Sequence, residues 1–220
     1  MFFIPFFMSK IYLILGMLLF KRILLIGFLV TVLNQLSAQN RVLGYYDDTL
    51  QIPTKLYYEG ELTADSLREG HWLYYYPDGA LWKDLNFLKG EYHGEQVVYY
   101  SNGLLSQYCR YENGQENGSW LEFFSNGDTS TIGEFVDANE EGVWRDYYIG
   151  GQLLKEGRYH AGLKEGLWVE YYPTDTIQFI AEYTQDTLNG SFIGFYPNGK
   201  AEYEVEYKHG LMNGPYTEYY

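Results

Sequence analysis

Residues 70–79 read GHWLYYYPDG, and residues 166–173 return to the same pattern as GLWVEYYP. Both stretches start at a glycine that recurs every 24 residues, without an insertion or a deletion, from Gly70 to Gly214. A fixed period in this range is typical of a repeat protein and decides the fold class. The seven glycines are Gly70, Gly94, Gly118, Gly142, Gly166, Gly190 and Gly214.

Aromatic residues keep the same period. Positions five and six after the glycine hold a pair of rings, such as Tyr75-Tyr76, and position seventeen holds a single ring, such as Phe87. Position two is aromatic in every unit except the second, which has Gln96. We expect the rings at positions two, six and seventeen to stack along the fold. Position two holds Trp72, Trp120, Trp144, Trp168, Phe192 and Tyr216.

Each unit is predicted to be a β-hairpin. Residues 72–76 are aromatic or branched and suit a pleated, half-buried surface. Asp78-Gly79 tolerates the positive φ of a tight turn, and a second loop at residues 89–94 returns the chain. A helix is disfavoured because two or three glycines per unit cost about 1 kcal/mol each in a helix interior. We therefore expect an all-β chain, built as an elongated single-layer antiparallel meander of stacked hairpins.

The repeat register also predicts the domain organisation. The repeat domain covers residues 61–220. It consists of a half repeat at 61–69, six whole repeats at 70–213 and a final half repeat at 214–220. Residues 39–60 precede the repeats and are predicted to form an N-terminal cap or linker.

Residues 1–38 are predicted to be a secretory signal peptide. A pair of cations precedes the apolar run 23–33, and a small-residue cleavage site ends at Ala38. Met17 is a candidate for the true start. The alternative is an uncleaved membrane anchor, which two adjacent cations near the middle of the span disfavour. We expect export to the periplasm, the cell envelope or the medium, without stable membrane contact after cleavage.

The repeat resembles a known family. The pattern Gly-x-Trp-x-x-Tyr-Tyr-Pro-Asn-Gly, followed by a strand that ends in Glu-x-Tyr-x-x-Gly-x-x-x-Gly, is similar to the bacterial variant of the MORN repeat. Residues 156–173 match it closely, and the resemblance covers about residues 60–220. It implies a hairpin-repeat fold that serves in protein binding, membrane association or scaffolding. Some bacterial members are labelled antitoxin-like, and no residue of the motif is catalytic.

The charge of the chain is strongly negative. The formal net charge is -14, and it becomes about -17 when residues 1–38, with three cations and no acids, are removed. This excess of acids disfavours nucleic acid and anionic membranes as partners. Position four of the repeat carries an acid in four units, which form either a solvated stripe or a surface for a cationic partner. These acids are Glu122, Asp146, Glu170 and Glu218.

Motifs of catalysis and of metal binding are absent from the sequence. It contains no His-x-x-x-His, Cys-x-x-Cys or Gly-x-Ser-x-Gly. The only cysteine, Cys109, cannot form an intramolecular disulfide and is expected to fill an apolar position. We therefore expect a non-enzyme without cofactor or metal.

Three functions remain open. The preferred one is an exported scaffold that binds an unidentified protein partner in the cell envelope. The others are an antitoxin-like or immunity protein that binds a cationic toxin, and a carbohydrate-binding module that holds a polysaccharide on its aromatic rows.

Overall fold

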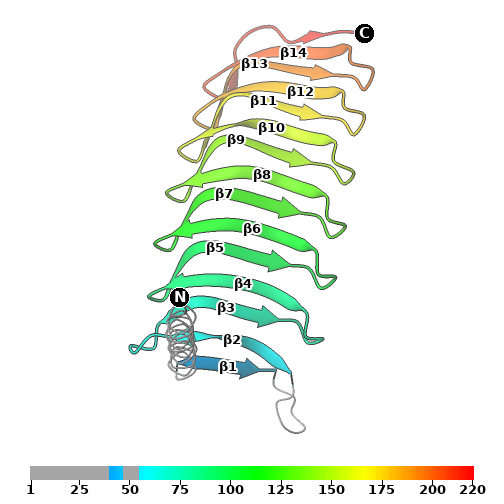
Figure 1. Cartoon of the computed structure of the whole chain (residues 1–220). Coiled ribbons are helices and arrows are strands. Elements are labelled where there is room, and N and C mark those ends of the chain that lie inside the picture. The colour runs from blue at the N-terminus through cyan, green and yellow to red at the C-terminus, as the bar shows by residue number, and fades with distance from the viewer. Residues whose placement is uncertain (1–39, 47–54) are drawn as a thin grey trace, which may run out of the picture.

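A computed structural model describes residues 40–46 and 55–220, which form one open antiparallel sheet (Figure 1). Consecutive strands are neighbours from β1 to β15, and β16 pairs with β14. The predicted signal peptide, residues 1–38, lies outside the described residues. The strands are β1 (Arg41–Tyr45), β2 (Leu56–Leu62), β3 (Arg68–Tyr75), β4 (Leu81–Leu88), β5 (Glu91–Tyr99), β6 (Leu105–Glu112), β7 (Gln115–Phe123), β8 (Thr129–Val136), β9 (Asn139–Tyr147), β10 (Leu153–His160), β11 (Leu163–Tyr171), β12 (Ile177–Thr184), β13 (Thr187–Phe195), β14 (Ala201–Lys208), β15 (Leu211–Met212) and β16 (Thr217–Glu218).

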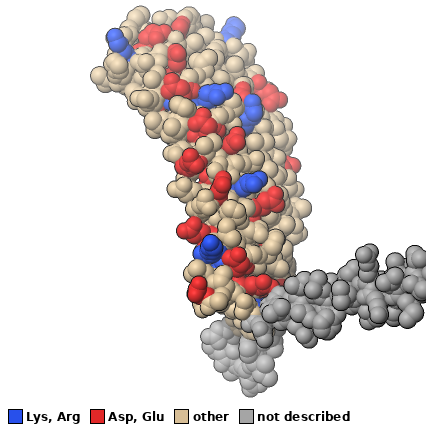
Figure 2. All heavy atoms as spheres, turned by 60° about the vertical axis from the view of Figure 1, so that its left-hand side comes forward, with Lys and Arg blue, Asp and Glu red and all other residues tan. Residues whose placement is uncertain are grey.

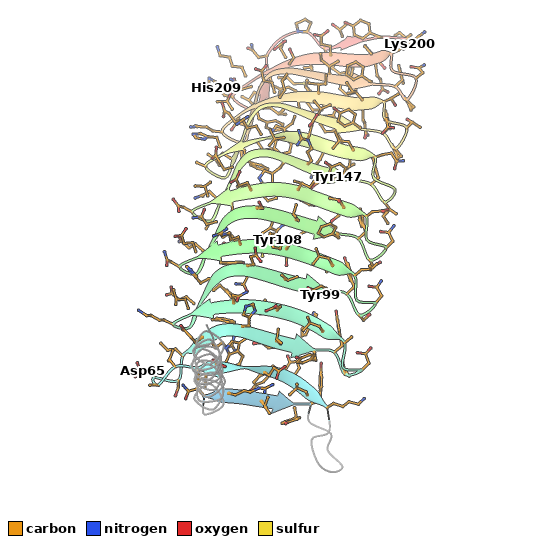
Figure 3. All side chains as sticks on the ribbon, viewed as in Figure 1. Asp65, Tyr99, Tyr108, Tyr147, Lys200 and His209 are labelled. Atoms are coloured by element: carbon orange, nitrogen blue, oxygen red, sulfur yellow. The ribbon has the colours of Figure 1, made fainter. Side chains whose placement is uncertain are left out.

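The described part of the chain is a single layer. Figure 1 shows the strands stacked one above another, with the turns in two rows along the long edges. Figure 3 places Asp65 and His209 on one of these edges and Lys200 on the other, with Tyr99, Tyr108 and Tyr147 between them. The expected fold, an all-β meander of hairpin repeats, is confirmed.

Both ends of the sheet differ from the predicted boundaries. Strand β2 crosses the boundary between residues 60 and 61, and β1 pairs with it, so residues 41–45 belong to the same sheet as the repeats. The predicted final half repeat, residues 214–220, contains only the two-residue strand β16. Pro215 lies just before β16 and has no N–H to donate to a ladder.

On the edge that contains His209, the turns from Lys89-Gly90 onward are two-residue type I′ turns, whereas the first turn of this edge, residues 63–67, is longer. In the first complete unit, Lys89 and Gly90 have φ of 52° and 89°, and two positive φ values match the right-handed twist of a hairpin. The turn is therefore shorter than the predicted loop of residues 89–94. The next strand, β5, already starts at Glu91.

In the six units from Gly70 to Gly190 the repeat glycine lies inside a strand and not in the turn, whereas Gly214 lies between β15 and β16. The pairing of β4 with β5 shifts register between Leu85 and Phe87, opposite the segment that contains Gly94. All seven repeat glycines have positive φ, from 62° at Gly70 to 149° at Gly214. The glycine within each strand thus forms a β-bulge. Any residue with a side chain would pay free energy to adopt the positive φ of this bulge.

The turns of the opposite edge share one hydrogen-bond pattern. The N–H of Tyr76 donates to the carbonyl of Ala80 over 2.8 Å, and the N–H of Gly79 donates to the carbonyl of Tyr76 over 2.9 Å. Asp175 replaces the turn glycine in the fifth unit. It still adopts a φ of 62° and donates to Tyr172 over 3.0 Å, so this departure from the repeat leaves the turn unchanged.

Tyrosines at position six tie each hairpin to the next. Their hydroxyls donate to the backbone carbonyl of position five in the following unit, over 2.7 to 3.3 Å. The rings at position six are thus held by hydrogen bonds, instead of the stacking that the sequence predicts. Phe124 has no hydroxyl and interrupts this series. The donors are Tyr76, Tyr100, Tyr148, Tyr172 and Tyr196.

Candidate binding face

One face of the sheet carries the tryptophans of position two, and we call it the tryptophan face. Each of these residues packs against a small or apolar residue at position fifteen of a neighbouring strand. A Cβ built on Gly157 would lie 2.1 Å from Cδ2 of the Trp168 ring, and one on Gly133 would lie 2.2 Å from the Trp144 ring. The glycines therefore let the indole rings lie flat on the backbone of the sheet.

The rings of positions two and seventeen form a zigzag along the tryptophan face. Neighbouring ring centroids are 5.1 Å apart between Phe135 and Trp144, 6.0 Å between Trp144 and Tyr159, and 4.9 Å between Tyr159 and Trp168. Their interplanar angles of 80° to 87° are edge-to-face, an arrangement that aromatic pairs prefer. The predicted stacking of these two positions is therefore present, in edge-to-face form.

Burial along position two is uneven. Trp72 and Trp168 are 4% and 5% exposed, whereas Trp120 and Trp144 are half-buried. A single-layer sheet buries a side chain only against its neighbours along the sheet. Exposure therefore depends on which residues the adjacent units supply.

Gln96, the exception at position two, has a structural role. Its amide accepts from the N–H of Asn86 over 3.0 Å and donates to the carbonyl of Asn86 over 2.9 Å. Asn86 lies in the bulge, where the ladder is interrupted, and buried backbone groups there need partners. Tyr92 fills the aromatic row at this point, with its ring 4.8 Å from Phe87 and 5.2 Å from Tyr111.

The acids of position four lie on the tryptophan face, and their environments differ. Glu122 accepts from Nε1 of Trp120 over 3.2 Å. Asp146 accepts from Oγ1 of Thr131 over 3.0 Å and lies 2.9 Å from Nζ of Lys155. These two acids are half-buried and engaged, so they are not the solvated stripe that the sequence allowed. Figure 2 shows acidic side chains recurring along the molecule, with basic ones between them.

The other two acids of this set occupy different settings. Glu170 is half-buried in β11, directly across from Lys155 and Phe179 on the neighbouring strands, as the pairing registers give. Glu218 is exposed in the short β16. The structure therefore brings Glu122, Asp146 and Glu170 into one row and leaves Glu218 at its end.

A hollow on the tryptophan face was not foreseen from the sequence. It has a volume of about 210 Å³ and contains Glu140, whose carboxylate has no protein hydrogen-bond donor among the described residues. Burial, followed by the charge of Asp186, raises the pKa of Glu140, while Lys164 opposes the rise. The lining residues are Thr131, Glu140, Trp144, Asp146, Lys155, Tyr159 and Trp168.

The opposite face has a different character. Its central row contains aliphatic residues, which are interrupted by Asp84, by Tyr108 and by the ion pair of Arg145 with Glu156, 3.0 Å apart. Tyr171 also donates to Glu156, over 3.3 Å. The aliphatic members of the row, which directly paired strands place on one side, include Leu73, Val97, Leu121, Ile132, Val169, Ile180 and Ile193.

Cys109 is buried between Gln96 and Trp120, its partners on the two adjacent strands. Burial, assisted by the charges of Glu116 and Glu122, raises the pKa of the Cys109 thiol to about 12. The thiolate is therefore a negligible species near neutral pH.

Two other kinds of site are absent from residues 40–46 and 55–220. No three or more His, Cys, Asp and Glu side chains gather there in a way that could hold a metal ion. Over the same ranges, no helix has the length and apolar character needed to cross a membrane.

Three hairpins match a family of known repeats. The model of the MORN repeat variant matches residues 68–89, 164–185 and 188–209. These segments cover the hairpin β3–β4 and, except for the first residue of β11 and of β13, the hairpins β11–β12 and β13–β14. MORN repeats are commonly protein-binding or membrane-binding repeat domains and are generally non-catalytic. No curated protein matches the chain.

Proposed function

We propose that the chain is a non-catalytic, exported scaffold that holds a protein partner in the cell envelope. The observation that carries this proposal is the single-layer sheet, which leaves the tryptophan face and the opposite face half-exposed along fourteen strands of five residues or more. Export itself rests on the sequence of residues 1–38.

Charge indicates the kind of partner. The chain carries 29 acids against 15 cations, and potentials across protein interfaces tend to be complementary. Glu122 and Glu170 place carboxylates in one row beside the indole rings of the tryptophan face. A partner with a basic surface and exposed apolar side chains fits this combination best.

The proposal is tested by capture from an envelope extract of the source organism on the immobilised full chain. A partner retained at low salt and released at high salt is expected, because salt screens contacts between exposed charges. Retention of purified cell-wall polysaccharide without any protein would contradict the scaffold and favour a carbohydrate-binding module. A captured toxin would instead favour the immunity role.

Matched variants localise the contact. Glu122→Gln combined with Glu170→Gln neutralises two acids of the tryptophan face, and the glutamine at 122 can still accept from Trp120. Glu134→Gln combined with Glu182→Gln makes the same change of charge at two exposed residues outside this row. Reduced capture is expected for the first pair only. Equal capture by both pairs would exclude the row of acids as the contact.

A further inference from the structure

The tryptophan face contains two examples of a cation held by an aromatic pair. The guanidinium of Arg68 lies 4.9 Å from the ring centroid of Trp72 and 5.1 Å from that of Phe87. The ammonium of Lys164 lies 4.5 Å from Trp168 and 5.1 Å from Tyr183. Cations within about 6 Å of a ring face are attracted by its quadrupole.

Both cations stand at the same place in the repeat, two residues before the repeat glycine. In the fourth unit this place holds Glu140, while the aromatic pair itself, Trp144 and Tyr159, is kept with 6.0 Å between its centroids. The chain therefore supplies the rings that receive a cation in the first and fifth units, but here it supplies a carboxylate in place of the cation.

Glu116 occupies the equivalent place in the third unit and provides a contrast. Its carboxylate accepts the hydroxyl of Tyr111 over 2.7 Å. Glu140 has no such donor among the described residues, and it borders the hollow of about 210 Å³. This volume is several times the roughly 30 Å³ that one water occupies in the liquid, so a side chain can enter.

Charge in the hollow favours a positive guest. Asp146 and Lys155, 2.9 Å apart, largely offset each other. Glu140 is then the lining acid that has no ion-pair partner among the described residues. Two charges outside the lining act on it with opposite signs, that of Asp186 and that of Lys164, which lies over Trp168 and Tyr183. A half-buried carboxylate beside two indole rings gains most from a cation that it can pair with directly.

From this juxtaposition we propose that the hollow receives an arginine or lysine side chain of a partner protein, which lies on Trp144 and Tyr159 and pairs with Glu140. The proposal deepens the scaffold function and rests on it, because it states how a basic partner is recognised. The guest would stand where Arg68 and Lys164 stand in their own units.

The test uses the purified full chain with ¹⁵N-labelled indoles, titrated with Nα-acetyl-arginine amide and Nα-acetyl-lysine amide. Saturable shifts of the Trp144 signal are expected, with Trp72 unchanged because Arg68 already occupies it. Nα-acetyl-citrulline amide, which is neutral and similar in shape to the arginine probe, is expected to produce no saturable shift. Equal shifts with the citrulline probe, or none with either cation, would overturn the proposal.

Variants of Glu140 test how much its carboxylate contributes to binding the cationic probes. Glu140→Lys places a cation where Lys164 stands in its unit and is expected to abolish the shift. Glu140→Gln is expected to weaken binding about tenfold, and Glu116→Gln is the matched control, with affinity unchanged. The other four indole signals report whether each variant is folded. If Glu140→Lys is folded and its titration is the same as that of the parent chain, the site is refuted. If Glu140→Lys does not fold, the affinity of Glu140→Gln decides whether the site exists.

Failure of the cation site and failure of the scaffold function give different results. If Glu140→Lys loses the small probes but still captures the envelope partner, the hollow binds cations without serving the partner, and the proposed contact is wrong. If no partner is captured by the unaltered chain while the probes bind, the scaffold function fails and the cation site stands.

Discussion

At the scale of single residues, Phe124 stands where five other units have a tyrosine that donates to the next unit. Phe124→Tyr is expected to add a hydrogen bond to the carbonyl of Tyr147 and to stabilise the fold by about 1 kcal/mol. The reciprocal control is Tyr148→Phe, which removes a bond of 2.9 Å to Tyr171 and is expected to cost about as much. Urea midpoints measure both, and a midpoint of Phe124→Tyr below that of the parent chain would contradict the bond.

Ala138 is a second departure from the repeat, and its backbone conformation is unfavourable for a residue with a side chain. It takes the second position of a type I′ turn with a φ of 62°, where Gly90 and Gly162 stand in other units. Ala138→Gly is expected to stabilise the protein by about 0.5–1 kcal/mol, because relief of the left-handed conformation outweighs the added freedom of glycine in the unfolded chain. Thermal unfolding measures the change. Gly162→Ala is the control, and it should lower the melting temperature.

At the scale of the strand, two tryptophans in the same repeat position are expected to differ in their contribution to stability. Trp168 in β11 is 5% exposed and lies on Gly157, so Trp168→Ala is expected to cost about 3–5 kcal/mol. Trp144 in β9 is half-buried, and Trp144→Ala should cost roughly 1–3 kcal/mol, since less apolar surface leaves water. Urea unfolding with a common slope tests the order, and equal losses would refute it.

The elements show what the sequence could predict and what it could not. The 24-residue period and the Asp-Gly and Asn-Gly breakers predict the hairpins, because both signals are local. The bulge at Gly94 was missed, since a glycine with positive φ fits a turn as well as a strand interior. Strand β1 and residues 56–60 of β2 lack the repeat register, so no sequence signal marked them as part of the sheet.

The candidate site was harder to predict than the fold. The position of the tryptophans and acids on one face follows from strand alternation once the register is known. The interpretation of the hollow as a cation site depends on a comparison of Glu140 with Arg68 and Lys164 at the same repeat position. This comparison could be made from the sequence. The comparison points to a cation site only once the structure shows that Trp144 and Tyr159 lie beside Glu140.

At the scale of the whole molecule, the sheet should lose stability in alkali. Burial raises the pKa of Tyr75 and of Tyr159 to about 12, against about 10 in an unfolded chain. The folded state thus favours the neutral phenols. Their contribution is complete below about pH 10 and is lost as the pH rises towards about 12.

Urea midpoints between about pH 8 and 11.5 measure this effect. They should stay level at first and then fall above about pH 10. Tyr159→Phe has one fewer phenol to ionise and is the control, with a shallower fall. A level midpoint across the whole range would show that these hydroxyls are as exposed in the folded state as in the unfolded one.

The tyrosine hydroxyls that join one hairpin to the next also have a mechanical consequence. Every bond of this kind spans 23 residues, so no tie reaches beyond the adjacent unit. A pulling force applied at the two ends would be carried by every junction between hairpins in series, and the molecule would open in steps of one repeat. Each step would release about 80 Å of extended chain, so the protein would lengthen under tension in successive steps of this size.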